Sequence, residues 1–128
     1  HDFFQKMWHF VGVGLLVLEA EANSTFAGDL LDSSTTNAGN GWRSSSWMGY
    51  FLSFSTGWKY HSTLGWIYSV PTSLESIWFY DQTLGWCWTS ETVYPFLWHH
   101  SVSGWLYYLK NSSPRSFYDY SDNAWKKL

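Results

Sequence analysis

From Trp42 to the end of the chain, aromatic residues alternate with other residues in short runs on either side of polar turns. The segments WKYHSTLGWIY, WFYDQTLGWCW, WHHSVSGWLYY and YDYSDNAW share this form. Alternation with a period of two is typical of β-strands, and glycine near the end of a short loop supplies the positive φ of a hairpin turn. The pattern predicts β-hairpins with positive φ at Gly65 and Gly85, and it indicates no helix after Trp42.

The hairpin pattern recurs with a period of about 20 residues, the kind of fixed spacing that marks a repeat architecture. A shift by this length aligns two columns of rings, the first with Trp58, Trp78, Trp98 and Tyr118 and the second with Trp66, Trp86, Trp105 and Trp125. We therefore expect an all-β fold, an antiparallel meander of β-hairpins built on the aromatic repeat. Strands average about five or six residues, which predicts roughly eight to ten of them.

The repeat also predicts how neighbouring strands pair. Tyr60 is expected to face Tyr68, and Tyr80 to face Trp88, as cross-strand aromatic pairs. The segments SVPTSLES, SETVYP and KNSSPRS are expected to turn the chain between hairpins, because each contains a proline that interrupts the hydrogen-bond ladder.

Residues 1–41 are expected to form an N-terminal segment and linker, and residues 42–128 the aromatic-repeat domain. The apolar run at residues 10–18 is too short for a bilayer, which needs about 20 residues, so no membrane span is predicted. Residues 1–22 fit either a signal-like segment ending at Ala20-Glu21-Ala22 or a short helix followed by a buried strand over Val11–Leu18. Residues 23–43 have the polar, glycine-containing composition of a loop.

Composition changes the picture of the core. Aromatic residues make up 23% of the chain and 11 residues are tryptophan, whereas aliphatic residues are few after Trp42. By elimination, most tryptophans are expected to lie in the core. The net charge of -3 provides no basic surface for a phosphate backbone, so nucleic acid is not an expected partner.

The residues that could carry chemistry are few and poorly grouped. Cys87, between two tryptophans, is expected to be a buried apolar residue. His99 and His100 are adjacent on a predicted strand and point to opposite faces, so with His61 they form no metal-binding spacing. The acidic residues of the repeat region lie mostly in predicted loops or turns and show no pairing of the kind that glycoside hydrolysis requires; they are Glu75, Asp81, Glu91, Asp119 and Asp122. We expect no catalytic residue, no metal site and no cofactor.

The run SSWMGYF, GWKYHSTLGWIY, WFYDQTLGWCWTS, YPFLW, GWLYYL and PRSFYDYSDNAW resembles an aromatic repeat region at the C-terminal ends of secreted or surface proteins of marine and environmental bacteria. This resemblance implies a module of a larger exported protein with an extracellular or cell-surface location. A looser similarity links the repeats to the choline- and glucan-binding repeats of cell-wall proteins.

Two functional classes remain open for such a module. A non-catalytic role in surface attachment or structural assembly, with possible self-association, is the first. The second is carbohydrate binding, to a glycan or cell-envelope polymer, because tryptophan rings on an open face form flat platforms for ligands. The candidate binding residues are the tryptophans of the two columns, namely Trp58, Trp66, Trp78, Trp86, Trp98 and Trp105.

Overall fold

The computed structural model of the chain describes residues 35–128, and these form one antiparallel sheet of 11 strands. The spatial order of the strands equals their order in the sequence, so every strand pairs with its sequence neighbours. The strands are β1 (Thr36–Gly39), β2 (Trp42–Ser45), β3 (Gly49–Ser53), β4 (Trp58–His61), β5 (Gly65–Ser73), β6 (Ser76–Asp81), β7 (Gly85–Ser90), β8 (Phe96–His99), β9 (Gly104–Leu109), β10 (Ser116–Asp119) and β11 (Ala124–Lys127). The all-β meander predicted from the repeat is confirmed, although the connection between β8 and β9 contains a short 3-10 helix, η2 (His100–Val102), where no helix was expected.

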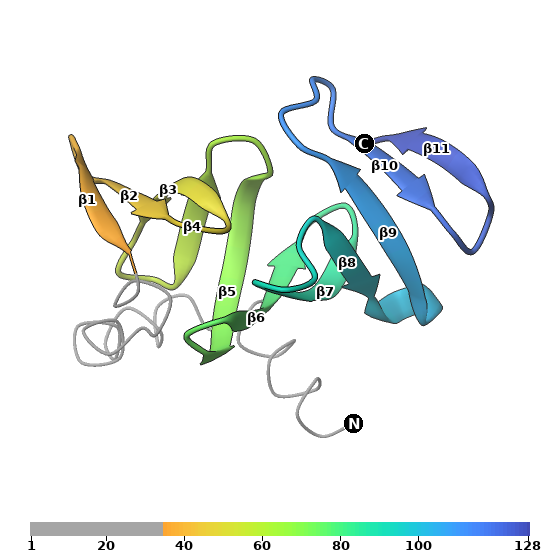
Figure 1. Cartoon of the computed structure of the whole chain (residues 1–128), viewed down its shortest axis with the longest axis horizontal. Coiled ribbons are helices and arrows are strands. Elements are labelled where there is room, and N and C mark those ends of the chain that lie inside the picture. The colour runs from red at the N-terminus through yellow and green to blue at the C-terminus, as the bar shows by residue number, and fades with distance from the viewer. Residues whose placement is uncertain (1–34) are drawn as a thin grey trace.

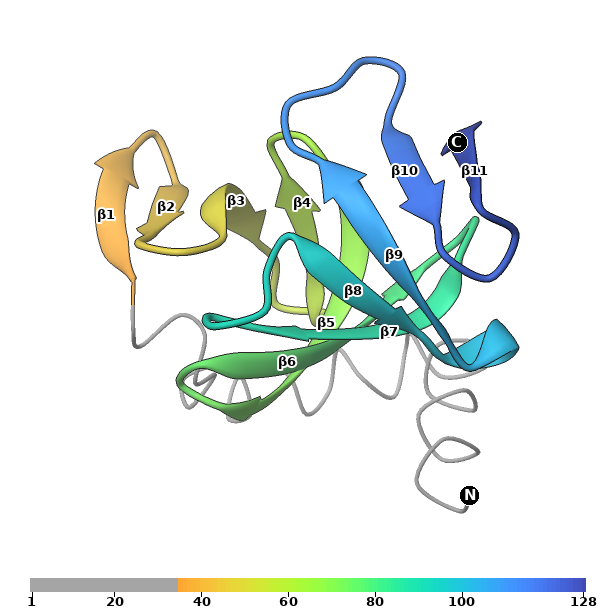
Figure 2. The same cartoon turned by 45° about the vertical axis from the view of Figure 1, so that its right-hand side comes forward.

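The sheet curls so that its two halves share one core. In Figure 1, β1–β5 lie on the left, β9–β11 on the right, and β6–β8 join the two groups. Figure 2 shows the same curl from the side of β9–β11. Phe51 of β3 and Phe117 of β10 belong to the same buried cluster, and the Arg115 guanidinium donates to the carbonyl of Leu64 in the β4–β5 loop at 2.9 Å. The inner faces of the two halves therefore face each other across the core.

Three hairpin loops have the same construction, at 45–49, 61–65 and 81–85. The first residue of each loop is a buried Ser45, His61 or Asp81, whose side chain accepts hydrogen bonds from the backbone N–H groups two and three residues later. The fourth residue is a buried Met or Leu, and the fifth is a glycine with φ between +80° and +92°. Three-residue loops that end in a left-handed glycine are a standard hairpin solution, and the positive φ predicted for Gly65 and Gly85 is confirmed.

The strand register differs from the predicted one by two residues. Tyr60 lies opposite Trp66, and Tyr80 lies opposite Trp86 rather than Trp88. The reason is the loop position: His61 pairs with Gly65, so the turn is centred on residue 63 instead of residue 64. The predicted pairs were wrong, although the residues do lie on one face, because the shift is by an even number of residues.

Two segments expected to be loops belong to the sheet. Strand β1 lies inside the polar stretch 23–43 and pairs with β2 around a turn with positive φ at Asn40 and Gly41. Its four residues are exposed, so backbone hydrogen bonds and turn geometry, rather than apolar burial, define this strand. Pro71 lies within β5, next to a register irregularity, and the chain turns later, between Ser73 and Ser76. The turns before Pro95 and Pro114 occur as predicted.

The core is built from small apolar residues and phenylalanine, not from tryptophan. The buried cluster on the inner face contains Met48, Phe51, Leu64, Ile67, Ile77, Phe79, Leu84, Cys87, Leu97, Leu106, Tyr108 and Phe117. Every tryptophan located in a described strand alternates onto the opposite face. The prediction that most tryptophans lie in the core was therefore wrong. The signal-like segment and the helix with a following strand, predicted for residues 1–22, fall outside the described residues.

Substitution of Gly85 by valine is expected to lower the free energy of unfolding by more than about 1 kcal/mol. Gly85 has φ +81°, and an added Cβ would meet no atom within 4 Å, so the cost arises from the backbone conformation alone. Gly85→Asn is the matched control, since asparagine tolerates this conformation, as Asn123 does at φ 53° in the last hairpin. Urea denaturation of both variants measures the effect, and equal stabilities would contradict the turn assignment.

Candidate functional site

The face opposite the core, called here the outer aromatic face, carries the rings of the repeat. Directly opposed residues form rows that cross the strands. The rows are Trp42–Leu52–Tyr60–Trp66, Trp58–Tyr68–Tyr80–Trp86, Val70–Trp78–Trp88–Trp98–Trp105 and Phe96–Tyr107–Tyr118–Trp125. Both sequence columns lie on this one face, because each hairpin loop joins its two strands in a register that puts Trp58 and Trp66 on the same side.

Neighbouring rings within these rows pack edge to face. The Tyr60–Trp66, Tyr80–Trp86, Trp98–Trp105 and Tyr118–Trp125 pairs have centroid distances of 5.2, 5.4, 5.5 and 5.5 Å with interplanar angles of 69°, 62°, 70° and 74°. These values lie in the range favoured by the quadrupoles of aromatic rings. The outer rings thus hold one another in fixed orientations.

The six predicted binding tryptophans differ in exposure. Trp66 and Trp105 are exposed, at 49% and 38% of their surface, whereas Trp86 is buried at 6%. Trp58, Trp78 and Trp98 are half-buried. The central part of the face therefore forms a second, smaller packed cluster around Tyr68 and Trp86, and only the rings outside it offer a surface.

The exposed rings fall into two groups. The first exposed patch consists of Tyr50, Phe54, Tyr60 and Trp66, which lie on β3, directly after β3, on β4 and on β5, respectively. The second exposed patch consists of Phe96, Trp105, Tyr120 and Trp125, on β8, β9, β11 and the β10–β11 loop. Three rings of the second patch, Phe96, Tyr120 and Trp125, form a closed circle of contacts with the neighbouring rings of Tyr107 and Tyr118. The centroid distances around this circle lie between 5.0 and 6.4 Å. Trp125, at 56% exposure, and Tyr120 are not among the six predicted binding residues.

Charge is distributed between the two faces in an unusual way. Among the described strands, the outer aromatic face carries one charged side chain, Lys127, next to the edge of the sheet. Arg43, Lys59, Asp81 and Asp119 all alternate onto the inner face. Soluble proteins normally place charged residues toward water and apolar ones inside. A solvent-facing surface of uncharged rings therefore points to contact with something other than bulk water.

The polar side chains of the inner face serve the hairpin loops. His61 Nε2 donates to the carbonyl of Met48, while its Nδ1 accepts from the N–H groups of Thr63 and Leu64, an arrangement that needs the neutral ring with its proton on Nε2. His99 Nε2 lies 2.7 Å from the carbonyl of Leu84 in the same way. These histidines hold successive loops against one another.

We expect acidification to destabilise the domain through His61. Burial lowers the pKa of His61 below its ordinary value of 6.5, although the hydrogen bond to Met48 acts in the opposite sense. The unfolded chain then takes up a proton at a higher pH than the folded one, so the contribution is complete above about pH 6.5 and is lost as the pH falls below it. Unfolding free energies measured at pH 7.5 and 5.5 should differ more in the wild type than in His61→Asn, which keeps a loop acceptor but does not titrate. Identical differences would contradict this role.

Three of the carboxylates, all aspartates, form ion pairs. Asp81 forms an ion pair with Arg115, and Asp119 and Asp122 both bind the ammonium group of Lys126. In the described part of the chain, no three His, Cys, Asp or Glu side chains lie close enough together to hold a metal ion. Nothing in this arrangement assembles an acid and a base around the exposed rings.

Cys87 is fully buried between Phe79 and His99 on the neighbouring strands, as expected for an apolar core residue. Burial and the charge of Asp81 raise the pKa of its thiol far above the ordinary value. We therefore expect a thiol reagent at pH 8 to label the urea-unfolded protein rapidly and the native protein only at the rate of unfolding. Cys87→Ala should cost about 1 to 2 kcal/mol of stability and leave ligand binding unchanged. Fast labelling of the native protein would contradict burial.

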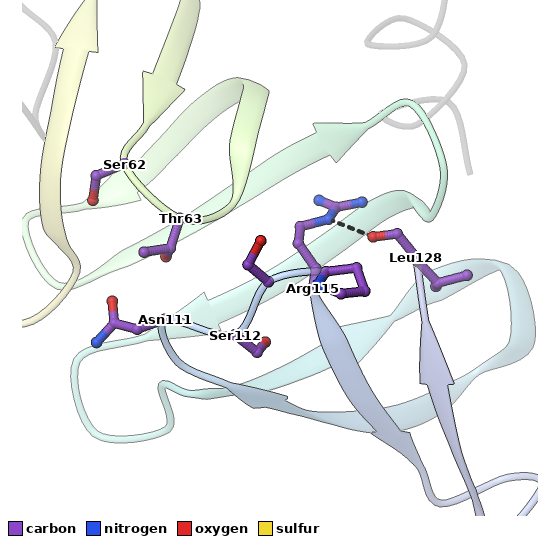
Figure 3. A pocket seen from close by; sticks show the side chains of 8 residues that line it. Ser62, Thr63, Asn111, Ser112, Arg115 and Leu128 are labelled. Atoms are coloured by element: carbon purple, nitrogen blue, oxygen red, sulfur yellow. Dashed lines mark hydrogen bonds between the residues drawn. The ribbon is translucent and has the colours of Figure 1, made fainter.

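A polar cleft of about 460 Å³ lies where the β4–β5 loop meets the β9–β10 connection. Figure 3 shows Ser62 and Thr63 on one side, Asn111 and Ser112 on the other, and Arg115 donating from Nε to the Leu128 carbonyl. Arg115 also donates to Leu64 and Asp81 from its other two nitrogens, so the one charged side chain of the lining is already satisfied. The cleft joins the two halves of the sheet and offers hydroxyl and amide groups.

Sequence reasoning missed two features of the site. The inner-face residues that begin the loops at Ser45, His61 and Asp81 recur four positions before a glycine, a signal that is readable in the sequence beside the Gly-Trp pairs. The second feature, the unequal exposure of equivalent tryptophans, has no counterpart in the repeat, because it depends on which strands lie at the ends of the curled sheet.

No protein-family model, curated protein or solved structure matches this chain. The structure itself defines the class: an aromatic-rich antiparallel β-hairpin meander with exposed clusters of rings. Within residues 35–128 there is no helix with the length and apolar character needed to cross a bilayer.

Proposed function

We propose that this domain is a non-catalytic binding module that attaches a larger exported protein to an uncharged polysaccharide through its outer aromatic face. The observation that carries the proposal is the inverted arrangement of the sheet, with charged residues inside and uncharged rings toward solvent. Positions that face water would ordinarily be charged, so their replacement by Trp and Tyr across successive strands indicates a ligand surface.

The chemistry of the exposed rings fits sugars. The C–H groups on one face of a pyranose carry a small positive charge, which the negative face of an aromatic ring attracts. The hydroxyl groups of Tyr50, Tyr60 and Tyr120 and the indole N–H groups of Trp66 and Trp125 are available along the rims of the rings to bind sugar hydroxyls. One stacked ring contributes on the order of 1 kcal/mol, so several rings in line are needed for useful affinity.

The near absence of charge favours a neutral polymer over a charged one. An acidic polysaccharide would need basic side chains on this face, and a choline-like cation would gain from a carboxylate beside the rings. In the described strands the face offers Lys127 and no carboxylate. An extracellular or cell-surface location belongs to the same proposal, because neutral structural polysaccharides are exposed there.

Tryptophan fluorescence titrated with defined hexasaccharides tests the proposal. The probes are the neutral hexasaccharides of β-1,3-glucan, β-1,4-glucan and α-1,4-glucan, with hexagalacturonate as the acidic comparison. At least one neutral probe should change the emission, and Trp66→Ala or Trp125→Ala should each weaken binding about five-fold or more at the exposed patch that contains the substituted ring. Leu74→Ala is the matched control, since Leu74 is exposed and apolar but lies in a turn outside the rows of rings.

Three outcomes would overturn the proposal. No response to any neutral probe would remove its basis, and tighter binding of hexagalacturonate would contradict the argument from charge. Concentration-dependent dimerisation in sedimentation, abolished by the same Trp→Ala changes without any effect of sugar, would instead assign the rings to contact between copies of the chain.

A further inference from the structure

The two exposed patches lie at opposite ends of the row system. In the first patch, Phe54 and Tyr60 each contact Trp66 at a ring-centroid distance of 5.2 Å; Tyr60 lies on β4, Trp66 on β5, and Phe54 directly after β3. The second patch occupies β8, β9, β11 and the β10–β11 loop. Between them stands the packed cluster of Trp58, Tyr68, Trp78, Tyr80 and Trp86, whose rings are buried or half-buried. The exposed surface is therefore interrupted.

The curl of the sheet turns these patches away from each other. Trp47, in the β2–β3 loop, contacts Tyr94 at 5.9 Å, and Tyr94 contacts Tyr108 of β9 at 6.5 Å. Together with the bond from Arg115 to Leu64, these contacts bring the inner face of β3–β5 against that of β9 and β10. The inner faces of these two groups of strands meet at one core, so their outer faces point in different directions. Figures 1 and 2 show the two groups of strands on different sides of the molecule.

Each patch has what a separate site needs. Each contains four exposed rings with at least one tryptophan, and the ring contacts of Trp66 and Trp125 lie on the outer aromatic face rather than across the core. On the outer aromatic face, the strands of the first patch carry no charged side chain and those of the second carry Lys127 alone, so both suit the same kind of neutral ligand. A single polymer chain that lay flat on one patch would have to bend around the sheet to reach the other.

We propose that the domain is bivalent, with two independent sites for uncharged polysaccharide that face away from each other, and that it cross-links two polymer chains. This inference rests on the proposed function and adds the number and direction of the sites. A module of this kind joins polymer chains into a network, whereas a module with one continuous platform would bind along a single chain.

Isothermal titration and turbidity test the inference on the whole chain. Titration with the neutral hexasaccharide that binds should give two sites per protein molecule for the wild type, and one unchanged site with one site weakened about five-fold or more for Trp66→Ala and for Trp125→Ala. Soluble β-1,3-glucan, hydroxyethyl cellulose and soluble amylose are the matching polymers for turbidity. The wild type should turn the bound polymer turbid, and each single variant should bind that polymer without turbidity. Near-UV circular dichroism of both variants checks that they are folded. The variants Trp66→Phe and Trp125→Phe keep a ring, so each should retain part of the affinity at the substituted site.

The outcomes separate this inference from the proposed function. Absence of binding by any probe overturns both. One site per molecule, or loss of all binding in either single variant, overturns bivalency and leaves a single platform. Turbidity that forms without polymer, or that both single variants retain, overturns cross-linking and assigns the turbidity to self-association.

Discussion

Replacing Arg115 by alanine is expected to lower the free energy of unfolding by about 3 kcal/mol, a large share of the stability of a domain of this size. Arg115 directly precedes β10 in the far half of the sheet and donates both to the Asp81 carboxylate and to the Leu64 carbonyl. The Asp81 side chain is only 4% exposed, so the substitution leaves a buried carboxylate without its cation. Removal of one partner from a buried ion pair is costly because the other charge stays out of water.

The same substitution also breaks the contact between the two halves of the sheet. Arg115 reaches 51 residues back along the chain to the β4–β5 loop, and it lies over the Phe117 ring at 5.4 Å. Urea denaturation of Arg115→Ala, Asp81→Asn and the double variant gives the coupling between the two residues. Asp81→Asn keeps an acceptor for the N–H groups of Thr83 and Leu84, so it isolates the loss of charge.

We expect the double variant to lose less stability than the sum of the two single variants, because Arg115→Ala should cost less when Asp81 carries no charge. Arg115→Lys is the conservative control, since it keeps the charge but loses the guanidinium group that donates to two acceptors at once. Its stability should fall between that of the wild type and that of Arg115→Ala. Losses below about 1 kcal/mol for Arg115→Ala, with no coupling to Asp81, would show that the two halves of the sheet do not depend on this contact.

Much of the fold could be predicted from the sequence because the repeat constrains it locally. The hairpins, their sequential pairing and the left-handed glycines follow from alternation, loop length and the glycine at each loop end, which are all properties of neighbouring residues. The burial of Cys87 could be predicted as well, since its position in the repeat is held by Ile67 and Leu106, which are also buried. In each case one hairpin contains all the information.

The assignment of the two faces could not be predicted, for a physical reason. A strand with a period of two has two possible inner faces, and most tryptophans were expected to lie in the core because aliphatic residues are few. The true inner face is interrupted in the sequence by Lys59, His61 and Asp81, which look like solvent-facing residues. They are buried because they serve other parts of the fold: Lys59 binds Ser53 and lies over the Phe51 ring, while His61 and Asp81 hold the loops. Such partners are visible only once the sheet has curled.

Truncation of Phe79 is expected to destabilise the domain far more than truncation of a larger ring on the outer aromatic face. Phe79 is fully buried on the inner face between Ser69 and Cys87, so Phe79→Ala removes a whole ring from the core and leaves a cavity, at a cost of about 3 to 5 kcal/mol. Trp66 is half-exposed and contacts Phe54 and Tyr60, so Trp66→Ala should cost about 1 kcal/mol.

Denaturation and sugar titration of Trp66→Ala and Phe79→Leu test the roles assigned to the two faces. The variant that loses more stability should be the one that keeps its affinity for sugar. Trp66→Ala should keep most of its stability and lose affinity at the first exposed patch. Phe79→Leu, a milder change that keeps an apolar side chain in the core, should lose stability but bind as the wild type does, because Phe79 faces away from the outer rings. If Trp66→Ala instead proved as destabilising as Phe79→Ala, the outer rings would be a second core rather than a surface. The aromatic repeat would then be explained by packing alone, since rings that the fold requires for stability need no ligand to account for their presence in every hairpin.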